Sequence, residues 1–281
     1  MDLLRQTKEF CNSAGIKPAR SKGQNFLISK SIYSKIIKEA ELKDSDQVLE
    51  VGPGLGFMTM ELSPKIERLV AVELDDRLAE ILESRLKELG LDNVELVNQD
   101  VLEFDSCSKF NSTDYKVVAN LPYNISSAFL RKMLSSEKGP ELSVLLLQKE
   151  VAERIIARPP EMSLLALSVQ YYTEAFFIKK VSAGNFWPKP KVDSAIVKLR
   201  KKSALPLDRA EEESFFKLLR LGFSSKRKML KNNLLKNSNL SSKDVDGILG
   251  KAGLNSKIRP QELSLSDWIK LYKLKKNYEK A

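Results

Sequence analysis

Two patterns of apolar residues alternate between residues 47 and 200. Short apolar runs, each of the length of a strand, occur at 47–51, 69–73, 94–98, 116–120 and 142–148. The segments between them have helical spacing. The clearest is 77–89, whose apolar residues share one helical face: Leu78, Ile81, Leu82, Leu86 and Leu89. Strands that alternate with helices predict an α/β fold with a mostly parallel, doubly wound sheet.

The pattern changes towards the end of the chain. Two further strand-like runs, 171–181 and 194–200, flank a Pro-rich connector and predict a closing antiparallel pair. A polar linker, 201–206, precedes segments with helical spacing and short Ser/Asn/Gly breaks. We therefore expect two domains: a Rossmann-like domain at 1–202 with a basic N-terminal segment and a terminal antiparallel strand, and a small, basic, all-helical domain at 203–281.

Charge is distributed unevenly along the chain. Residues 1–200 hold 28 Lys+Arg and 28 Asp+Glu, whereas residues 201–281 hold 19 and 9, which accounts for the net charge of +10. The first 38 residues are also basic, with 8 Lys+Arg and 2 acids. A neutral or acidic middle between two basic flanks favours a polyanionic partner such as nucleic acid. A solvated lysine surface is the alternative.

Composition excludes several classes of protein. The hydrophobic content is 42%, enough for a sizeable core, and no apolar run reaches the roughly 18 residues of a membrane helix. The first residues lack the apolar stretch of a signal peptide. Cys11 and Cys107 are the only cysteines, and the chain has no histidine. Disulfide frameworks, thiolate or histidine metal sites and histidine-dependent nucleophiles are therefore not expected, and we predict a cytoplasmic protein without a metal.

A glycine-rich turn, Glu50-Val51-Gly52-Pro53-Gly54-Leu55-Gly56, follows the first predicted strand. Glycines permit a tight turn and let the backbone approach a ligand closely. The dinucleotide fingerprint would need glycine where Phe57 stands, and the Gly-Lys-Ser/Thr of a phosphate-binding loop is missing. Pro53 also removes an N–H that a diphosphate would use. The turn favours a nucleoside ligand without a diphosphate.

Polar residues stand at the ends of successive predicted strands. Glu73 lies 21 positions after Gly52, the spacing at which an acid binds a ribose hydroxyl. Asp100 ends the next strand region, where a carboxylate can accept a hydrogen bond from an adenine amine. Because ligands bind at the carboxyl ends of such strands, these residues and Asn120 form a candidate site. The alternative is that they are ordinary loop acids and turn glycines.

The peptide Asn120-Leu121-Pro122-Tyr123 suits recognition of the exocyclic amine of a base. Asn120 offers a carbonyl acceptor. Pro122 fixes its own φ and favours an extended Leu121, whose carbonyl then points in a set direction. Tyr123 offers a plane for stacking. The alternative is a simple turn, because Asn and Pro are common turn residues.

Together the motifs resemble the ribosomal RNA adenine dimethyltransferase family, nearest to its bacterial small-subunit branch. They are Lys22-Gly23-Gln24-Asn25-Phe26-Leu27, the turn 50–56, Val72-Glu73-Leu74-Asp75, Gln99-Asp100, residues 120–126, Gln148-Lys149-Glu150-Val151 and residues 186–194. The resemblance implies a class I S-adenosylmethionine-dependent methyltransferase fold. It also implies transfer of methyl groups to N6 of two adjacent adenines in a hairpin near the 3′ end of small-subunit RNA, and hence a role in small-subunit biogenesis.

The resemblance also implies roles for individual residues. Cofactor contacts are expected at Asn25, Leu27, Gly52, Gly54, Glu73, Asp100 and Asn120. Catalytic and target-base contacts are expected at Asn120, Leu121, Pro122, Tyr123 and Phe186, with Tyr123 and Phe186 as two plates around the extruded adenine. RNA-binding residues are expected at Lys22, Arg220, Lys226, Arg227, Lys228 and Lys231.

One segment departs from the family pattern, and two other functions stay open. Residues 158–165 are shorter than usual and lack a Tyr-Gly pair, so the local loop geometry is not expected to match. The first alternative is a large-subunit adenine methyltransferase of the macrolide-resistance type. The second is a non-catalytic RNA-binding factor of ribosome assembly. The absence of sustained apolar heptads favours a monomer, with an assembling small subunit or its RNA as partner.

Overall fold

The structure is a computed structural model that describes residues 2–18, 24–110, 115–136, 138–225, 227–236 and 241–280. It divides into two compact units. The first comprises the chain up to residue 152 together with 174–201, and the second comprises 153–173 together with the chain from residue 202. Two predicted RNA contacts, Lys22 and Lys226, lie outside the described residues.

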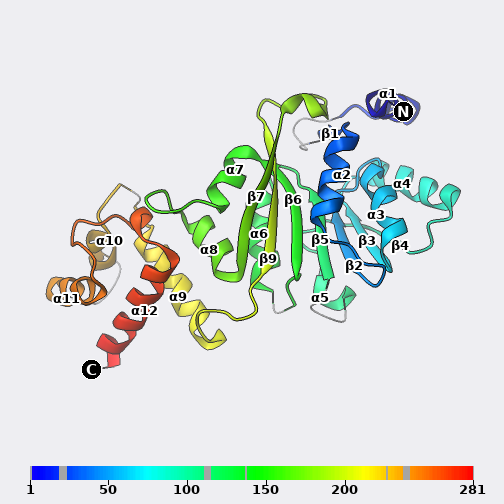
Figure 1. The fold of residues 1–281 in the computed structure, drawn as a ribbon. Coiled ribbons are helices and arrows are strands. Elements are labelled where there is room, and N and C mark those ends of the chain that lie inside the picture. The colour runs from blue at the N-terminus through cyan, green and yellow to red at the C-terminus, as the bar shows by residue number, and fades with distance from the viewer. Residues whose placement is uncertain are drawn as a thin grey trace. The chain divides into compact units, whose positions relative to one another are not determined.

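A seven-stranded sheet with the order β4-β3-β2-β5-β6-β9-β7 forms the first unit (Figure 1). Its strands are β2 (Gln47–Val51), β3 (Arg68–Glu73), β4 (Val94–Asn98), β5 (Tyr115–Asn120), β6 (Leu142–Gln148), β7 (Thr173–Val181) and β9 (Ser194–Lys201). The pairs among β2 to β6 are parallel, and β9 runs antiparallel to β6. The predicted doubly wound sheet with a terminal antiparallel strand is confirmed.

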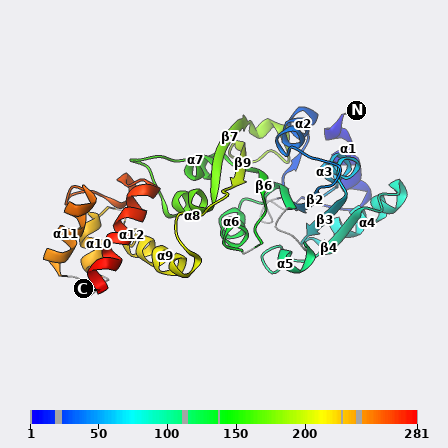
Figure 2. The ribbon, with the colours of Figure 1, turned by 60° about the horizontal axis from the view of Figure 1, so that its bottom comes forward.

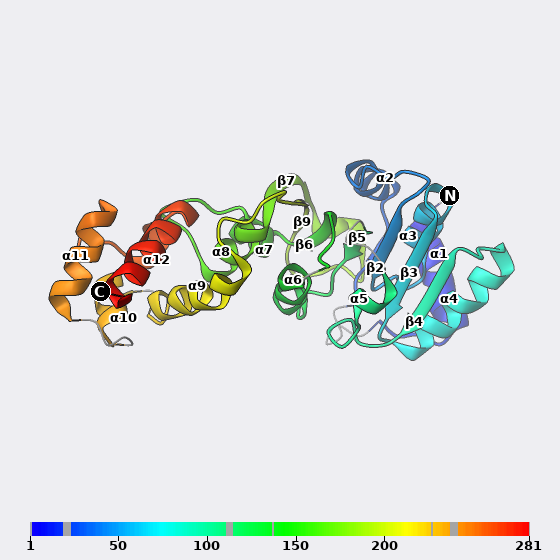
Figure 3. The ribbon, with the colours of Figure 1, turned by 90° about the horizontal axis from the view of Figure 1, so that it is seen from below.

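Helices cover both faces of this sheet (Figure 3). On one face, α2 (Lys30–Glu39) and α3 (Phe57–Leu62) bury Ile36 and Leu62 against strand residues such as Val48. On the other, α5 (Ser106–Lys109) and α6 (Ser126–Ser135) lie over the neighbouring strand residue Leu49, which shares a small cavity with Phe129. Because successive strand residues point to opposite faces, continuous apolar strands need this double cover.

A short β-ribbon lies beside the main sheet. Strand β1 (Phe26–Leu27) pairs antiparallel with β8 (Phe186–Trp187), so that Phe26 faces Trp187 and Leu27 faces Phe186. Nearby, α1 (Leu3–Ser13) and α4 (Asp76–Leu89) contribute Cys11 and Leu78 to one buried cluster with Phe26. Short 3₁₀ turns at Ser63–Lys65 and Ala183–Asn185 complete this unit.

The second unit is helical, as predicted (Figure 2). It contains α8 (Leu164–Tyr172), α9 (Arg209–Gly222), α10 (Leu230–Lys236), α11 (Ser242–Ala252), α12 (Leu265–Lys280) and the 3₁₀ turn Pro260–Glu262, and α7 (Lys149–Ile155) spans the junction of the two units. Its core surrounds the fully buried Trp268. A Cβ on Gly222 would lie 2.2 Å from that ring, so α9 and α12 approach closely only because residue 222 is glycine.

One boundary differs from the prediction. Residues 153–173 were expected in the first domain, but Ala166, Leu167 and Tyr171 belong to the core of the second unit. The Tyr171 and Phe215 rings lie 5.4 Å apart between centroids. Tyr171 and Tyr172 also end helix α8 and do not begin strand β7. Their β-like composition was misleading because an aromatic contact far along the chain determines where they pack.

Among the described residues, none of the helices combines the length and the apolar character that crossing a membrane requires.

Candidate functional site

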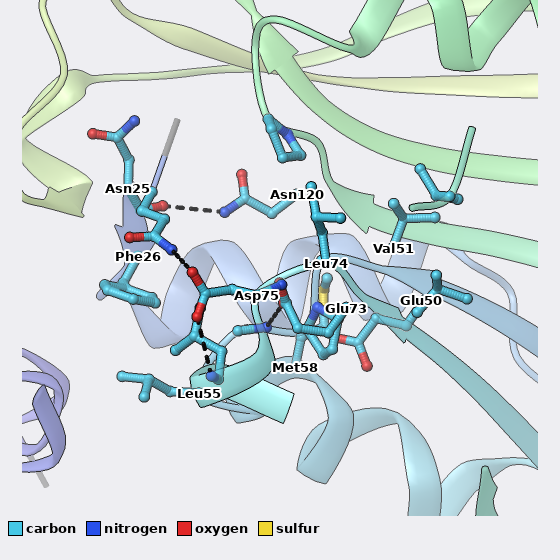
Figure 4. A pocket seen from close by; sticks show the side chains of 18 of the residues that line it. Asn25, Phe26, Glu50, Val51, Leu55, Met58, Glu73, Leu74, Asp75 and Asn120 are labelled. Carbon is cyan, nitrogen blue, oxygen red and sulfur yellow. Dashed lines mark hydrogen bonds between the residues drawn. The ribbon is translucent and has the colours of Figure 1, made fainter. Parts of the chain in front are cut away.

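A cavity of about 310 Å³ opens at the carboxyl ends of the parallel strands (Figure 4). Its walls come from β1, from the glycine turn after β2, and from the ends of β3, β4 and β5. The predicted site residues that line it are Asn25, Leu27, Gly52, Gly54, Glu73, Asp100, Asn120 and Pro122. Residues separated by almost a hundred positions therefore meet at one edge of the sheet, as expected for a doubly wound fold.

The glycine turn lines the cavity with backbone, and at two of its glycines there is no room for a side chain. Gly54 has φ +57°, and a Cβ there would lie 3.3 Å from the Phe26 ring. Gly56 has φ +79°, and a Cβ there would lie 2.4 Å from Leu82. Positive φ favours glycine. Arg85 supports the turn from outside, because it donates to the Leu55 carbonyl.

Glu73 is held at the end of β3 by two backbone donors. The Gly54 N–H donates to Oε2 at 3.0 Å, and the Asp75 N–H donates to Oε1 at 2.9 Å. The side chain is largely buried, and burial raises its pKa above the ordinary value although both hydrogen bonds oppose this shift. Each carboxylate oxygen has a further lone pair, so Glu73 can still accept hydrogen bonds from the hydroxyls of a ribose.

Glu50 is a buried acid of the cavity wall, and only one of its two carboxyl oxygens has a hydrogen-bond partner among the described residues. It is fully buried in β2, and the Thr59 hydroxyl donates to Oε2 at 2.7 Å. Its other oxygen, Oε1, has no hydrogen-bond partner among the described residues. Burial raises the pKa of Glu50 to about 8. A buried carboxyl oxygen without a partner is costly and indicates a missing ligand or proton.

In the sequence Glu50 stands out only as the first residue of the glycine-rich segment 50–56. An acid inside the apolar run Val48-Leu49-Glu50-Val51 was the available signal, because charged residues are rarely fully buried unless they are paired. The apolar walls of the cavity were also not predicted. They include Phe26, Leu55, Met58, Leu74 and Val101.

Asn120 is oriented by a contact across the cavity. Its Nδ2 donates to the backbone carbonyl of Asn25 at 3.3 Å, which Figure 4 shows as a dashed line. Because the NH₂ group faces Asn25, the acceptor Oδ1 points the other way. The next residue, Leu121, donates its N–H to the Leu146 carbonyl at 3.2 Å, which extends the pairing of β5 with β6. The end of β5 therefore presents an amide of set orientation.

Three predicted catalytic residues do not line the cavity. Leu121 as a whole is buried, with 1% of its surface exposed, and it is not part of the cavity wall. Tyr123 is half-buried and shares a 2.8 Å hydrogen bond with the hydroxyl of Ser194. Phe186 is 3% exposed and belongs to the core under α2. Phe186 therefore offers no open face for stacking in this structure, because its ring packs in the core with residues of α2 such as Ile36.

The predicted RNA contacts in the second unit differ in availability. Arg220, Arg227 and Lys228 are exposed. Lys231 instead pairs with Asp246 at 2.6 Å, and its side chain is only 23% exposed. Of the described basic residues near the turn between α9 and α10, the first three are thus open to a phosphate group, whereas Lys231 already has an acidic partner.

The cavity fits a nucleoside that carries a cationic substituent. Glu73 suits ribose hydroxyls, the apolar wall suits a purine, and Glu50 Oε1 is a buried acceptor that none of the described residues binds. S-adenosylmethionine, which the sequence resemblance implies, combines these three chemical features.

Comparisons with known proteins agree with this geometry. The family model described as ribosomal RNA adenine dimethylase matches residues 16–276. A curated protein of Dehalococcoides mccartyi named ribosomal RNA small subunit methyltransferase A is 41% identical over 271 residues, which is 96% of this chain and 92% of that protein. A dimethyladenosine transferase from Plasmodium falciparum is similar in structure, with a TM-score of 0.76, 30% identity and coverage of 88% and 95%. The 23S rRNA methyltransferase ErmE has a TM-score of 0.73, 29% identity and coverage of 89% and 99%.

Proposed function

The chain belongs to the ribosomal RNA adenine dimethylase family, and we propose that it dimethylates N6 of two adjacent adenines in a 3′-terminal hairpin of small-subunit (16S) ribosomal RNA. S-adenosylmethionine is the methyl donor of this family. The small-subunit target is supported by curated relatives of that name at 36–41% identity over nearly the whole chain. The large-subunit alternative has weaker support, because ErmE is 29% identical.

The observation that carries the proposal is the position of Asn120. Its side chain shares one cavity with Gly52, Glu73 and Asp100, and the Asn25 carbonyl fixes its amide so that an oxygen is the group presented. A non-catalytic RNA-binding factor would not need this arrangement.

Two oxygen atoms at the end of β5 prepare adenine N6 to act as the nucleophile. The cofactor supplies an electrophilic methyl group when it is bound. The lone pair of adenine N6 is delocalised into the ring and has to be released from it. In the first transfer Asn120 Oδ1 and the Leu121 carbonyl each accept one N6 hydrogen, which favours a pyramidal nitrogen with its lone pair free to react. In the second transfer only one N6 hydrogen remains, for one of the two acceptors. After each transfer N6 loses one proton to solvent, and the cofactor leaves as the neutral thioether. Both acceptors also stabilise positive charge as it develops on N6. No histidine is needed as a base, and the chain has none.

Tyr123 is the better supported of the two proposed base-stacking residues. Its hydroxyl is tied to Ser194, which restrains the ring beside Pro122. Phe186 would have to leave its buried position under α2 to form the second plate. We retain it as a target-base contact that depends on a shift of β8.

The second unit holds the RNA backbone in this proposal. Phosphate contacts from Arg220, Arg227 and Lys228 would position the hairpin without reading its bases. The partner is small-subunit ribosomal RNA or an immature small subunit, which places the protein in the cytoplasm, where it would act as a monomer.

Tritium transfer from labelled cofactor tests the proposal directly. Purified small-subunit RNA, immature small subunits and large-subunit RNA are compared as acceptors, and label is expected in dimethyladenosine of the small-subunit samples. Label confined to large-subunit RNA would support the macrolide-resistance type. No label in any sample would support the non-catalytic factor.

A further inference from the structure

Arg85 on α4 binds the glycine turn without being part of the cavity wall. Its Nη1 donates to the backbone carbonyl of Leu55, which belongs to that turn. The Leu55 side chain lines the cavity and is 1% exposed. The neighbouring Gly54 N–H donates to Glu73, so the position of this stretch of backbone determines where a donor for the Glu73 carboxylate lies. Arg85 thus acts on the cavity through the backbone of the turn.

Two aromatic rings hold the guanidinium group of Arg85. Its Cζ lies 4.4 Å from the centre of the Phe10 ring on α1 and 5.3 Å from the centre of the Phe57 ring at the start of α3. Both distances are within the roughly 6 Å at which a cation is attracted to the face of a ring. The two rings also meet edge to face, with centroids 6.3 Å apart and planes at 65°. Phe57 belongs to the cavity wall, so Phe10 is the ring of this pair that comes from outside the site.

Helix α1 reaches the same turn by a second contact. Cys11, the residue after Phe10, is 1% exposed and lies in one buried cluster with Leu55 and Phe26. Helix α1 therefore packs in the cluster that holds the Leu55 side chain and also supplies a ring to the cation that binds the Leu55 carbonyl. Cys11 alone would serve to cover the cluster. The ring of Phe10 over Arg85 is what links α1 to the backbone of the turn.

We propose that α1 is part of the cofactor site: Phe10 holds Arg85 in place, and Arg85 holds the glycine turn in the shape that binds the cofactor. The inference rests on the proposed function, because it takes S-adenosylmethionine as the ligand of the cavity. Neither Phe10 nor Arg85 lines the cavity, so both are positioning residues. Docking of α1 and binding of the ligand are then coupled. The factor by which docked α1 raises the affinity for the ligand is also the factor by which the ligand stabilises the docking of α1.

Calorimetric titration of S-adenosylhomocysteine into the full-length protein measures the effect of α1 on the ligand. Arg85→Met keeps the length of the side chain but loses the donor and the cation, and Phe10→Ala loses the ring. Each should weaken binding about two- to thirtyfold, the range that corresponds to a cation–π contact. Arg85→Lys retains a cation for the two rings and should lose less affinity than Arg85→Met. In steady-state methylation the KM for the cofactor should rise, and kcat at saturating cofactor should stay unchanged.

A double variant tests whether Phe10 acts through Arg85. In the Arg85→Met background, Phe10→Ala should weaken binding little further, because residues that act through one shared contact do not have additive effects. Two surface variants are the matched controls. Lys87→Met changes an exposed cation on α4, and Glu9→Ala changes an exposed acid on α1 next to Phe10. Both controls should bind S-adenosylhomocysteine as tightly as the unaltered protein does.

Hydrogen exchange on the unaltered protein measures the effect of the ligand on α1 and does not depend on the folding of any variant. S-adenosylhomocysteine should slow the exchange of the backbone amides of α1. The amides of α11, in the second unit, should exchange at the same rate with and without the ligand.

The outcomes distinguish this inference from the proposed function. Unchanged affinity in both Arg85→Met and Phe10→Ala, additive losses in the double variant, or unchanged exchange of the α1 amides overturns the role of α1 while the cofactor site stands. Failure of the unaltered protein to bind S-adenosylhomocysteine removes the cofactor site itself and the proposed function with it.

Discussion

Asn120 at the end of β5 and Asn25 just before β1 are joined by a 3.3 Å hydrogen bond from the side-chain amide of the first to the backbone carbonyl of the second. The contact fixes which end of the Asn120 amide faces Asn25. It also ties the end of β5 to the segment before β1, and both line the cavity.

Replacement of Asn120 should separate catalysis from binding. Asn120→Ala removes the acceptor that we propose to act on N6 as charge develops, so kcat should fall by at least about 10²–10³-fold. Asn120→Asp should also be impaired, because a carboxylate cannot donate to the Asn25 carbonyl. Single-turnover methyl transfer measures the rate, and a gel-shift assay should show unchanged RNA affinity. Near-normal turnover in Asn120→Ala would contradict the assigned role.

The hydroxyl and the ring of Tyr123 should have different effects. Tyr123→Phe keeps the stacking plane and loses only the bond to Ser194, so a small effect is expected, and Ser194→Ala should match it. Tyr123→Ala loses the stack, worth about 1–3 kcal/mol, so the KM for RNA should rise. Steady-state kinetics on the three variants tests this order. An equal rise in the KM for RNA in Tyr123→Phe and Tyr123→Ala would mean that the hydroxyl, and not the ring plane, is required.

Salt dependence should identify the phosphate contacts. Arg227→Gln and Lys228→Gln each remove an exposed cation, so each should lower the slope of log K against log salt by about 0.7–0.9. Lys231→Gln is the matched control, because Lys231 already pairs with Asp246 and should change the slope less. Fluorescence anisotropy at several salt concentrations measures the slope. An unchanged slope in both Arg227→Gln and Lys228→Gln would mean that these residues of the second unit do not bind RNA phosphates.

The stability of the ligand-free protein should depend on the titration of Glu50. Its pKa rises from 4.5 to about 8 on folding, so between these pH values the folded protein binds a proton that the unfolded chain does not. The free energy of unfolding is therefore highest below pH 4.5, as far as Glu50 contributes, and falls as pH rises towards 8. Glu50→Gln should show a smaller fall in urea unfolding over this window. If the free energy of unfolding falls equally in the unaltered protein and in Glu50→Gln, the titration of Glu50 is not the cause of the fall.

Replacement of two glycines of the second unit by alanine should change the stability of that unit in opposite directions. Gly222→Ala places a Cβ 2.2 Å from Trp268 and should destabilise the unit by about 1–3 kcal/mol. Gly250 lies in α11, and an added Cβ there would meet no atom of the described residues within 4 Å other than its own helical backbone and chain neighbours, so Gly250→Ala should stabilise that helix by about 0.5–1 kcal/mol. Thermal unfolding followed by circular dichroism tests both. Tolerance of Gly222→Ala would mean that α9 can move away from Trp268.

The positions of the sheet and of the polar strand ends could be predicted because they depend on local pattern. Apolar runs marked the parallel strands, and parallel strands bring Glu73, Asp100 and Asn120 to one edge whatever the connections contain. The family roles of these residues stay predictions that the experiments above address.

What the sequence did not predict depends on distant contacts. Nothing near Phe186 indicates that it pairs with Leu27, 159 positions earlier, or that its side chain is buried in the core beneath α2. Lys231 belonged to a basic run, yet Asp246 on the next helix binds it. Tyr171 resembled a strand residue but packs on Phe215. In each case a partner far along the chain overrides the local signal.

The two backbone N–H groups bound by Glu73 have a consequence for redesign of the methyl donor. Since one carboxylate both holds the glycine turn and is the group that we propose to bind the ribose, a substitution at Glu73 should alter the turn and the proposed sugar site together. Leu74 lines the same cavity with 65% of its surface exposed. A smaller residue at position 74 would widen the cavity, so that it could admit a methyl donor with an enlarged purine. Such a matched pair of variant and donor could be used to label ribosomal RNA with synthetic alkyl groups.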